Sequence, residues 1–457
     1  MEKKGKNMIH KFKIDDVRIV LDVNSGAVHS VDELVYDILE HYPSKNEGET
    51  IKLLEGKYKK DEIKDAIQEI KYLIDNEMLF SKDTYINNHD FINRKPVIKA
   101  LCLHIAHDCN IRCEYCFASQ GDFRGDRSLM SEDIGKKALD FLIENSGNRR
   151  NLEVDFFGGE PLLNFDVVKS LVEYGRKREK ETNKRFRFTI TTNAVLLNDE
   201  IIDYINENMD NIVLSIDGRK EINDKMRYAV NGEGTYDIII PKIKKMVEVR
   251  KDKSYFVRGT FTKHNLDFAK DVLHLADLGF KNTSIEPVVA KPGESYALQE
   301  EDLPEIFKHY EELAREIIRR EKSGKGFNFF HFMIDLEQGP CVIKRLTGCG
   351  AGSEYLAITP QGDIYPCHQF VGDEKFKIGN VLTGIENKEL GLSFKNAHVY
   401  NKEKCKECWA KFYCSGGCHA NAYNFNNDIN IPYELGCEME KKRIECSLYI
   451  KEKLNME

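Results

Sequence analysis

The sequence predicts an α/β protein built around a partial (β/α)6 barrel of the TIM type. A small winged-helix-like module precedes the barrel, and a cysteine-rich domain follows it. Three observations predict this arrangement. Strand-like and helix-like runs alternate over residues 98–324, a short strand–strand–helix pattern comes before them, and none of the 13 cysteines lies within residues 117–340. A chain of 457 residues is also long enough for two or three domains.

Composition removes several classes of function. The net charge is −8, so nothing suggests a nucleic-acid partner or an acidic membrane surface. No run of 18 apolar residues predicts a membrane-spanning helix, and the basic N-terminus lacks the apolar core of a signal peptide. We therefore expect a cytoplasmic protein. Disulfides are rare in that compartment, so the 13 cysteines indicate metal or redox chemistry.

The first 82 residues predict the winged-helix-like module. Residues 8–31 alternate apolar and polar side chains around the turn signal NSG, which is typical of two paired strands. Helical spacing follows in VDELVYDILEHY and again in KDEIKDAIQEIKYLIDNEMLF. Residues 83–97 are polar, and we assign them to a linker.

Residues 98–324 predict the barrel. Its strand-like runs are VIKALCLHIA, LEVDFFGG, RFRFTITTN, NIVLSIDG, YFVRGTF and NTSIEPVV, and helix-like runs lie between them. Such alternation gives parallel strands with right-handed helical crossovers. Six units are too few for the eight of a closed barrel, so a partial barrel is expected, with an open doubly wound sheet as the alternative. Residues 325–457 form the cysteine-rich domain, where metal ligation would substitute for a large core.

The stretch HDCNIRCEYCF carries three cysteines just beyond the first strand of the barrel. Cys109, Cys113 and Cys116 have the spacing C-x3-C-x2-C. Functional sites of parallel α/β folds lie at this end of the strands. Three thiolates can hold three irons of a [4Fe–4S] cluster and leave the fourth iron open for a ligand. The alternative is a zinc site completed by a distant His or Cys. Cys102, within the strand, is expected to be a core residue.

This spacing, with Tyr115 inside it, resembles the signature of radical S-adenosylmethionine (SAM) enzymes. In that family the open iron is chelated by SAM, which is cleaved to methionine and a 5′-deoxyadenosyl radical. The resemblance implies further SAM contacts at successive strand ends: the FFGGEP motif at the second, TTN at the third, LSIDG at the fourth, and an arginine after it. The implied SAM-binding residues are Tyr115, Gly158, Gly159, Glu160, Pro161, Thr192, Asn193, Ser215, Asp217 and Arg227.

Each of these motifs is weak alone. GGEP is more often a turn than a ligand site, and a Ser or Asp at a strand end is usually a cap. Within the resemblance, Glu160 is expected to meet the SAM ammonium and Arg227 the SAM carboxylate. Ser215 and Asp217 are two residues apart, so their side chains point to the same face of the strand, and both are expected at the ribose.

The C-terminal cysteines resemble a SPASM domain, which carries two auxiliary [4Fe–4S] clusters. A pair of zinc knuckles is the alternative. Matched to that domain, the first auxiliary cluster takes Cys349, Cys367 and Cys418, and the second takes Cys405, Cys408, Cys414 and Cys437. The first cluster is one ligand short. Cys341 fills it, or a cysteine of the substrate binds there, as in thioether-forming relatives. Cys446 is expected to be a packing residue.

The N-terminal module resembles the recognition element of peptide-modifying enzymes, where a leader peptide adds a strand to a sheet edge. A DNA-binding winged helix is the competing interpretation. Residues 1–80 contain 13 Lys or Arg and 17 Asp or Glu, a net charge of −4, whereas DNA binding needs a basic excess. A plain packing domain also remains open.

Taken in order, the three parts resemble a thioether-forming peptide maturase of the sactisynthase or ranthipeptide synthase type. The nearest resemblance is to enzymes acting on small "six cysteines in forty-five" precursor peptides. This implies SAM and three [4Fe–4S] clusters as cofactors, a cysteine-rich peptide with a leader as substrate, and flavodoxin or ferredoxin as reductant. Two alternatives stay open. One is another SPASM chemistry, either sulfatase-type oxidation or carbon–carbon crosslinking; the other is a non-catalytic iron–sulfur electron carrier.

Overall fold

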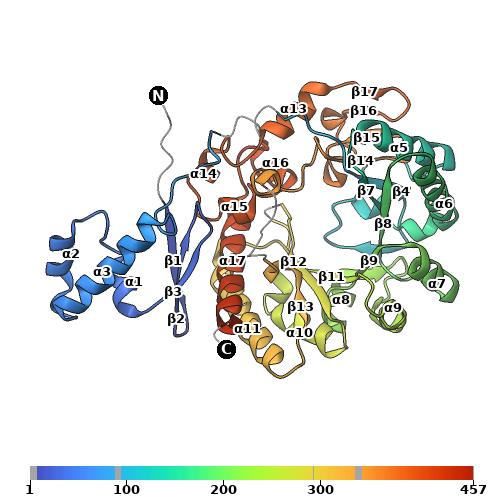
Figure 1. The fold of residues 1–457 in the computed structure, drawn as a ribbon. Coiled ribbons are helices and arrows are strands. Elements are labelled where there is room, and N and C mark those ends of the chain that lie inside the picture. The colour runs from blue at the N-terminus through green and yellow to red at the C-terminus, as the bar shows by residue number, and fades with distance from the viewer. Residues whose placement is uncertain (1–7, 88–93, 292, 335–341, 456–457) are drawn as a thin grey trace.

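The protein is described by a computed structural model that covers residues 8–87, 94–291, 293–334 and 342–455. Its N-terminal module lies at one side, the barrel at the other, and the C-terminal domain runs along the top of the barrel and back between them (Figure 1). The long C-terminal helix α17 (Glu434–Asn455) stands between the N-terminal sheet and the far end of the barrel. No described helix is long and apolar enough to cross a membrane.

Six parallel strands form the barrel, which confirms the predicted fold class. Neighbouring strands follow chain order, and each pair is parallel. The strands are β4 (Ala100–His107), β7 (Asn151–Gly158), β8 (Arg185–Thr192), β9 (Asn211–Ser215), β11 (Phe256–Phe261) and β12 (Asn282–Pro287). In β7 and β8 every second residue is fully buried, because one face packs under helices while the other faces the barrel interior.

The crossover helices cover the outside of this sheet. They are α5 (Glu132–Asn145), α6 (Phe165–Glu181), α7 (Asp199–Asn208), α9 (Tyr236–Arg250), α10 (Ala269–Asp277) and α11 (Leu303–Lys322), with the short α8 (Lys220–Met226) before α9. Local signals start two of them: the side chains of Ser131 and Asn198 each accept a hydrogen bond from a backbone N–H of the first turn. The helices therefore begin where the sequence placed them.

The C-terminal domain is joined to the barrel sheet, which the sequence did not indicate. Strand β14 (Tyr355–Ile358) pairs parallel with β4, and β15 (Asp363–Tyr365), β16 (Gly379–Asn380) and β17 (Gly384–Ile385) continue the sheet antiparallel. At the other end β13 (Asn328–Phe329) pairs with β12. Buried Glu354, just before β14, forms ion pairs with Lys99 and Arg94 beside β4. The barrel and the cysteine-rich domain thus share one sheet.

Short helices carry most of the remaining C-terminal chain. They are α12 (Val342–Thr347), α13 (Lys388–Asn396), α14 (Glu403–Lys406), α15 (Lys411–Cys414) and α16 (His419–Asn426). Three small strands lie near the cysteine loop of the barrel: β5 (Ile111–Cys113), β6 (Ser128–Leu129) and β10 (Arg227–Ala229).

The N-terminal module has three antiparallel strands and three helices. The pair of strands expected around NSG is β2 (Val17–Asp22) and β3 (Val28–Val31), and β1 (Ile9–Ile14) pairs with the other edge of β2. The expected helices are α1 (Glu33–Ile38) and α3 (Lys60–Asp75), and the sequence analysis missed α2 (Glu47–Leu54) between them. Helix α3 turns Ile63, Ile67 and Ile70 inward, so most of the apolar stripe seen in the sequence forms this module's core.

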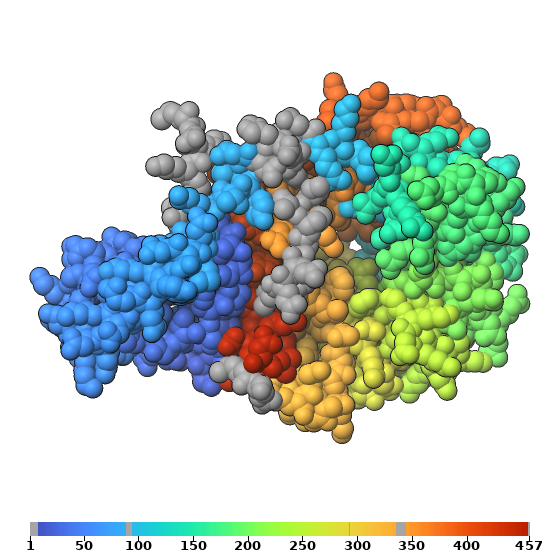
Figure 2. Space-filling view, viewed as in Figure 1, coloured from blue at the N-terminus to red at the C-terminus, as the bar shows by residue number. Residues whose placement is uncertain are grey.

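The module is docked firmly on the C-terminal domain (Figure 2). The ring of His10 stacks on that of Trp409 with centroids 3.6 Å apart, and its Nε2 lies 3.0 Å from a carboxylate oxygen of Glu445. Asp83, which the sequence placed in a polar linker, is instead buried: its carboxylate meets Nζ of Lys411 at 2.9 Å and accepts a hydrogen bond from Tyr400. The chain that leaves the N-terminal module is therefore held to the C-terminal domain at Asp83.

Replacing Asp83 by Asn should destabilise this junction strongly. The Asp83 and Lys411 side chains are only 1 % and 3 % exposed, and losing one charge leaves the other buried without compensation. Such a loss costs about 3–5 kcal/mol. We expect a clear fall in the thermal unfolding midpoint of the cluster-loaded protein. Combining Asp83→Asn with Lys411→Met should restore part of it.

Asp16→Asn is the matched control, because Asp16 pairs with Lys453 at the exposed surface. It should leave the midpoint unchanged. An equal fall in both variants would mean that the buried pair is not special.

Candidate active site

The three cysteines of the barrel lie on a loop that follows β4. Cys113 ends β5 and pairs across to Arg227 at the start of β10. A side chain of the loop braces its backbone: Nη1 of Arg112 donates to the carbonyls of Cys109 and Ile111 at 2.7 and 2.8 Å. The loop follows the carboxyl end of β4, where the sequence predicted it.

The glycines of the GGEP motif serve a close approach of backbone to backbone. A Cβ on Gly158 would stand 2.3 Å from the carbonyl oxygen of Ala106, and one on Gly159 would stand 2.1 Å from that of Asp108. The backbone N–H of Gly159 donates to Ala106 at 2.8 Å. Glycine is thus required so that the end of β7 can support the cysteine loop, in addition to lining the pocket beside it.

Glu160 does not face the pocket. It is fully buried, and its carboxylate accepts hydrogen bonds from Oγ1 of Thr192 (2.7 Å) and from the backbone N–H of Asn193 (2.8 Å) and Leu162 (3.0 Å). Burial raises the pKa of Glu160 to about 7, against the lowering effect of these hydrogen bonds. Glu160 joins the end of β7 to the end of β8, and Pro161 beside it is also buried outside the pocket lining.

Asp217 is likewise corrected from a ribose contact to a buried partner of Tyr115. The Tyr115 hydroxyl lies 2.6 and 2.8 Å from the two carboxylate oxygens of Asp217, one of which also accepts the backbone N–H of Thr260. Burial, followed by the nearby Asp217 carboxylate, raises the pKa of Tyr115 well above its ordinary value. The sequence analysis placed Ser215 and Asp217 on the same side of one strand. Strand β9 ends at Ser215, so the alternation of side chains does not extend to Asp217, and of the two only Ser215 lines the pocket.

Arg227 is poised toward the pocket with spare donors. Its Nη1 donates to the Tyr115 hydroxyl at 3.2 Å and its Nη2 to the carbonyl of Ser215 at 3.5 Å, while Nε has no hydrogen-bond partner in the described part of the chain. Arg227 is 7 % exposed. A buried guanidinium with an unused donor fits a carboxylate ligand, which is the role expected for it with SAM.

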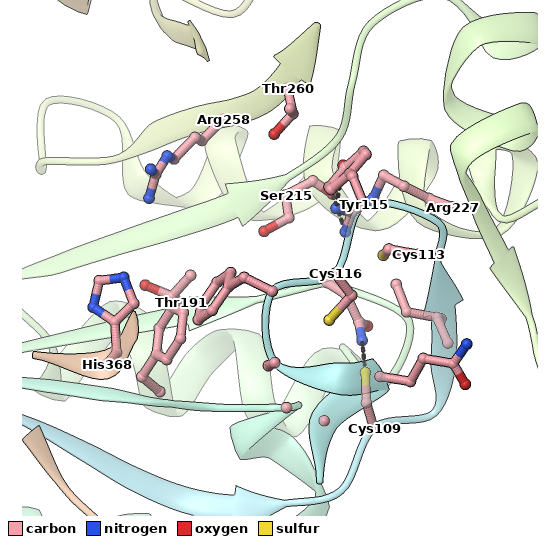
Figure 3. Close-up of a pocket in the computed structure, with 18 of the residues that line it drawn as sticks. Cys109, Cys113, Tyr115, Cys116, Thr191, Ser215, Arg227, Arg258, Thr260 and His368 are labelled. Atoms are coloured by element: carbon pink, nitrogen blue, oxygen red, sulfur yellow. Dashed lines mark hydrogen bonds between the residues drawn. The ribbon is translucent and has the colours of Figure 1, made fainter. Parts of the chain in front are cut away.

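A cavity of about 260 Å³ opens between the cysteine loop and the barrel interior (Figure 3). All three cysteines line it, and so do seven of the ten expected SAM residues: Tyr115, Gly158, Gly159, Thr192, Asn193, Ser215 and Arg227. The amide of Asn193 reaches back to the loop, donating to Oδ1 of Asn110 at 2.7 Å and lying 3.7 Å from the Cys109 sulfur. The residues expected from successive motifs therefore meet at one cavity.

The opposite wall of this cavity was missed by the sequence analysis. It includes Thr191, Arg258, Thr260, Glu286 and His368, with Arg258 and Glu286 joined by an ion pair of 2.6 Å. Figure 3 places Arg258 and His368 at the end of the pocket away from the cysteines. Four of these residues lie on barrel strands: Thr191, Arg258, Thr260 and Glu286. The alternation of inward-facing side chains along those strands is the sequence signal that could have identified them. His368 comes from the C-terminal domain, and no local pattern marks it.

Two thiols of the barrel loop have a raised pKa. Burial raises the pKa of Cys109 to about 11 and that of Cys113 to about 12, with the Arg227 charge lowering both. Metal binding would displace the protons of these thiols, since the thiolate is the ligand. In the described residues no three His, Cys, Asp or Glu side chains converge as they would around a single ion. A [4Fe–4S] cube differs in that each thiolate binds a separate iron.

The C-terminal cysteines fall into the two groups expected from the sequence. In the first, burial raises the pKa of Cys367, and the nearby thiols of Cys418 and Cys349 add to the rise. Cys349 and Cys418 are exposed, whereas Cys367 is buried. Cys341, the expected alternative fourth ligand, lies outside the described residues.

The second group lines a cavity of about 720 Å³ between α14, α15 and α17. Its members are Cys405, Cys408, Cys414 and Cys437. Burial raises the pKa of Cys437 to about 11, and the thiols of Cys405 and Cys408 contribute. Four thiols around one buried cavity could hold a fully ligated cluster. Cys102 and Cys446 belong to neither group and are fully buried in β4 and α17.

Comparison with known protein families gives two matches. The profile described as the Radical SAM superfamily matches residues 103–276, and the profile described as an iron–sulfur cluster-binding domain, SPASM, matches residues 349–409. These ranges contain the barrel cysteine loop and four of the seven C-terminal cysteines.

Three curated relatives cover most of the chain. An uncharacterized protein of Methanocaldococcus jannaschii is 30% identical over 320 residues, which is 69% of this chain and 96% of the relative. A cysteine-type anaerobic sulfatase-maturating enzyme of Clostridium novyi is 25% identical over 358 residues, 74% of this chain and 92% of the relative. The radical SAM cyclopropyl synthase TigE of Paramaledivibacter caminithermalis is 22% identical over 428 residues, 86% of this chain and 84% of the relative.

Solved structures share the fold. Native anSMEcpe with bound AdoMet superposes with a TM-score of 0.64 at 21% identity, covering 78% of this chain and 98% of that one. Streptococcus suis SuiB bound to the precursor peptide SuiA gives a TM-score of 0.53 at 17% identity, covering 93% and 97%. The SuiB match covers more of this chain than the anSMEcpe match does.

Replacing Arg227 by Met should weaken SAM binding about 10- to 100-fold, because a charge-assisted hydrogen bond contributes about 1.5–3 kcal/mol. Anaerobic equilibrium dialysis of the iron-loaded protein with labelled SAM measures this. Arg150→Met is the control, since Arg150 is exposed just before β7, at the opposite end of the strands. Unchanged affinity in Arg227→Met would remove Arg227 from the site.

Proposed function

The chain belongs to the radical SAM superfamily, and on this premise we propose that it installs thioether crosslinks in a ribosomally made, cysteine-rich precursor peptide. Cys109, Cys113 and Cys116 would hold the cluster that binds SAM. Cys349, Cys367 and Cys418 would hold a first auxiliary cluster, and Cys405, Cys408, Cys414 and Cys437 a second. Bound in the barrel, SAM and its cluster would supply a 5′-deoxyadenosyl radical that removes a hydrogen atom from the peptide.

One observation carries the proposal: the barrel pocket shares a wall with a cavity that reaches the auxiliary cysteines. Glu286, Pro287 and Val289 line the barrel pocket, and the same residues line a second cavity of about 290 Å³ that reaches Cys418 of the first group and Cys414 and Cys437 of the second. A peptide segment lying along this wall could touch the SAM site with one residue and the region around Cys418 with another. A thioether needs such a pair of sites, one for the carbon and one for the sulfur.

Residues of the chain prepare both sites. Arg227, fixed by Tyr115 and Asp217, would hold the SAM carboxylate, and Asn193 would orient the cysteine loop. Glu286 gives the shared wall a negative charge, and its ion pair with Arg258 places a positive charge in the barrel pocket beside it. Each crosslink removes two hydrogens from the peptide: the carbon loses a hydrogen atom and the thiol a proton. Formation of the carbon–sulfur bond from a carbon radical and a thiolate releases one electron, which balances the one electron consumed when SAM is cleaved.

The N-terminal module is proposed to bind the leader of this peptide. Its sheet ends at β3, an edge strand able to accept another strand. Among the fold neighbours, SuiB was solved with a precursor peptide, which supports the same kind of partner here. A flavodoxin or ferredoxin would supply the electron.

The sulfatase-maturating relative favours a second candidate, oxidation of a single Cys or Ser without crosslinking. The two chemistries leave different products. A thioether removes a free thiol and creates no carbonyl, whereas sulfatase-type oxidation produces an aldehyde that reacts with a hydrazide.

Two cysteine variants should separate SAM cleavage from coupling. Cys113→Ala should abolish 5′-deoxyadenosine release, because the SAM cluster loses a ligand. Cys418→Ala should retain release but lose crosslinked peptide. The assay uses the full-length, anaerobically reconstituted protein with dithionite, SAM and a leader–core peptide, followed by mass spectrometry. Wild-type product should be lighter by two hydrogens per crosslink.

Cys446→Ala is the control, since that thiol is buried in α17 away from both groups. A hydrazide-reactive product from the wild type would replace the thioether proposal by the second candidate. No 5′-deoxyadenosine from fully iron-loaded protein would leave the electron carrier.

A further inference from the structure

A buried lysine stands within the cysteine-rich domain. Lys402 precedes α14, has no exposed surface, and is one of the largest fully buried side chains of the protein. Lysine is almost never fully buried unless its charge is compensated. No motif in the sequence marks it.

Lys402 is tied to the segment between the two cysteine groups. Its Nζ donates to the carbonyl of Gly416 at 2.8 Å and lies 3.3 Å from Nδ1 of His419. Because an ammonium group can only donate, Nδ1 of His419 is the acceptor in this contact. The backbone carbonyl of Lys402 also accepts the N–H of Cys405 at 3.0 Å. One residue thus contacts segments that carry ligands of both groups.

The segment it holds is short and conformationally unusual. Only Ser415, Gly416 and Gly417 separate Cys414 of the second group from Cys418 of the first, and all three have left-handed backbone angles, with φ of 60°, 89° and 72°. Ser415 adopts this conformation at a cost that glycine would not incur. The bond from Lys402 to Gly416 holds the middle of this connection, and so fixes one cysteine group relative to the other.

The charge of Lys402 has no carboxylate partner in the described parts of the chain. The groups around it are thiols instead: in their ionised form, Cys405, Cys414, Cys418 and Cys437 oppose the lowering of the Lys402 pKa by burial. Burying an ammonium ion without a counter-charge costs several kcal/mol. Clusters ligated by thiolates are anionic and would supply that counter-charge from both sides.

We propose that Lys402 is a positioning residue shared by the two auxiliary clusters. Its buried positive charge favours the reduced form of each cluster. Reduction adds one electron and one negative charge to a cluster, so a neighbouring cation raises the reduction potential. The electron comes from an external one-electron donor, dithionite in the test. The inference rests on the proposed two-cluster assignment, but not on which peptide bond is formed.

The test is a redox titration of the full-length, anaerobically reconstituted protein, followed by electron paramagnetic resonance. Lys402→Met and Lys402→Gln remove the charge, and Lys402→Arg keeps it. Gln also retains an N–H donor for Gly416. At a fixed potential the ratio of reduced to oxidised auxiliary cluster should fall about tenfold in the neutral variants, which is about 59 mV for one electron. The SAM cluster should titrate as in the wild type.

Lys406→Met is the matched control, because Lys406 ends the helix that Lys402 precedes but pairs at the surface with Glu403. It should leave both auxiliary potentials unchanged. Auxiliary potentials equal to wild type in Lys402→Met and Lys402→Gln with full iron content would overturn the proposal. If those variants assemble less iron while Lys402→Arg assembles it fully, the charge is required for the clusters themselves, which supports it.

Loss of iron in Lys402→Arg as well would assign Lys402 a role in shape alone and overturn the electrostatic inference. A wild-type iron and sulfide content too low for two auxiliary clusters is a separate result. It would refute the two-cluster assignment, whatever the lysine variants do.

Discussion

The pairing of β14 with β4 is the contact on which the arrangement of the site depends. It places Ala357 opposite Cys102 in a parallel register and joins the cysteine-rich domain to the barrel sheet. Cys349 lies shortly before β14 and Cys367 shortly after β15, so both are fixed relative to the strand that leads into the barrel cysteine loop. His368, next to Cys367, reaches the SAM pocket for the same reason. Without this pairing the two halves of the shared wall would have no defined distance.

The buried charged groups around the site are compensated in two ways. Glu160 and Asp217 are buried carboxyls, but each is surrounded by hydrogen-bond donors and serves to join strand ends. Arg227 and Lys402 are buried cations close to thiols: Arg227 lies near Cys113 as well as Asp217, and Lys402 near cysteines of both auxiliary groups. These two cations are matched to anionic ligands, so cluster loading and the stability of the surrounding chain are linked.

The docked N-terminal module lies close to the second cysteine group. Met8 and Ile9 line the same cavity as Cys405 and Cys437, and the His10–Trp409 stack closes its side. The module also contacts α11 and α17 through Asp15, which pairs with Arg315 and accepts the Tyr449 hydroxyl. A leader bound at the edge of this sheet would therefore be held by a part of the molecule that is rigidly attached to the catalytic domains.

The sequence by itself determined the strand and helix order of the barrel, the clustering of the cysteines and many of the residues that line the barrel pocket. These follow from local signals: periodicity, caps, and motifs that come at successive strand ends, which parallel topology must bring to one edge. Tertiary structure alone decided that Glu160 and Asp217 turn away from the pocket, because their hydrogen-bond donors come from other strands. It also decided the β14–β4 pairing, the burial of Asp83 and the isolation of Lys402. Each of these depends on partners far away in the chain, which no local pattern encodes.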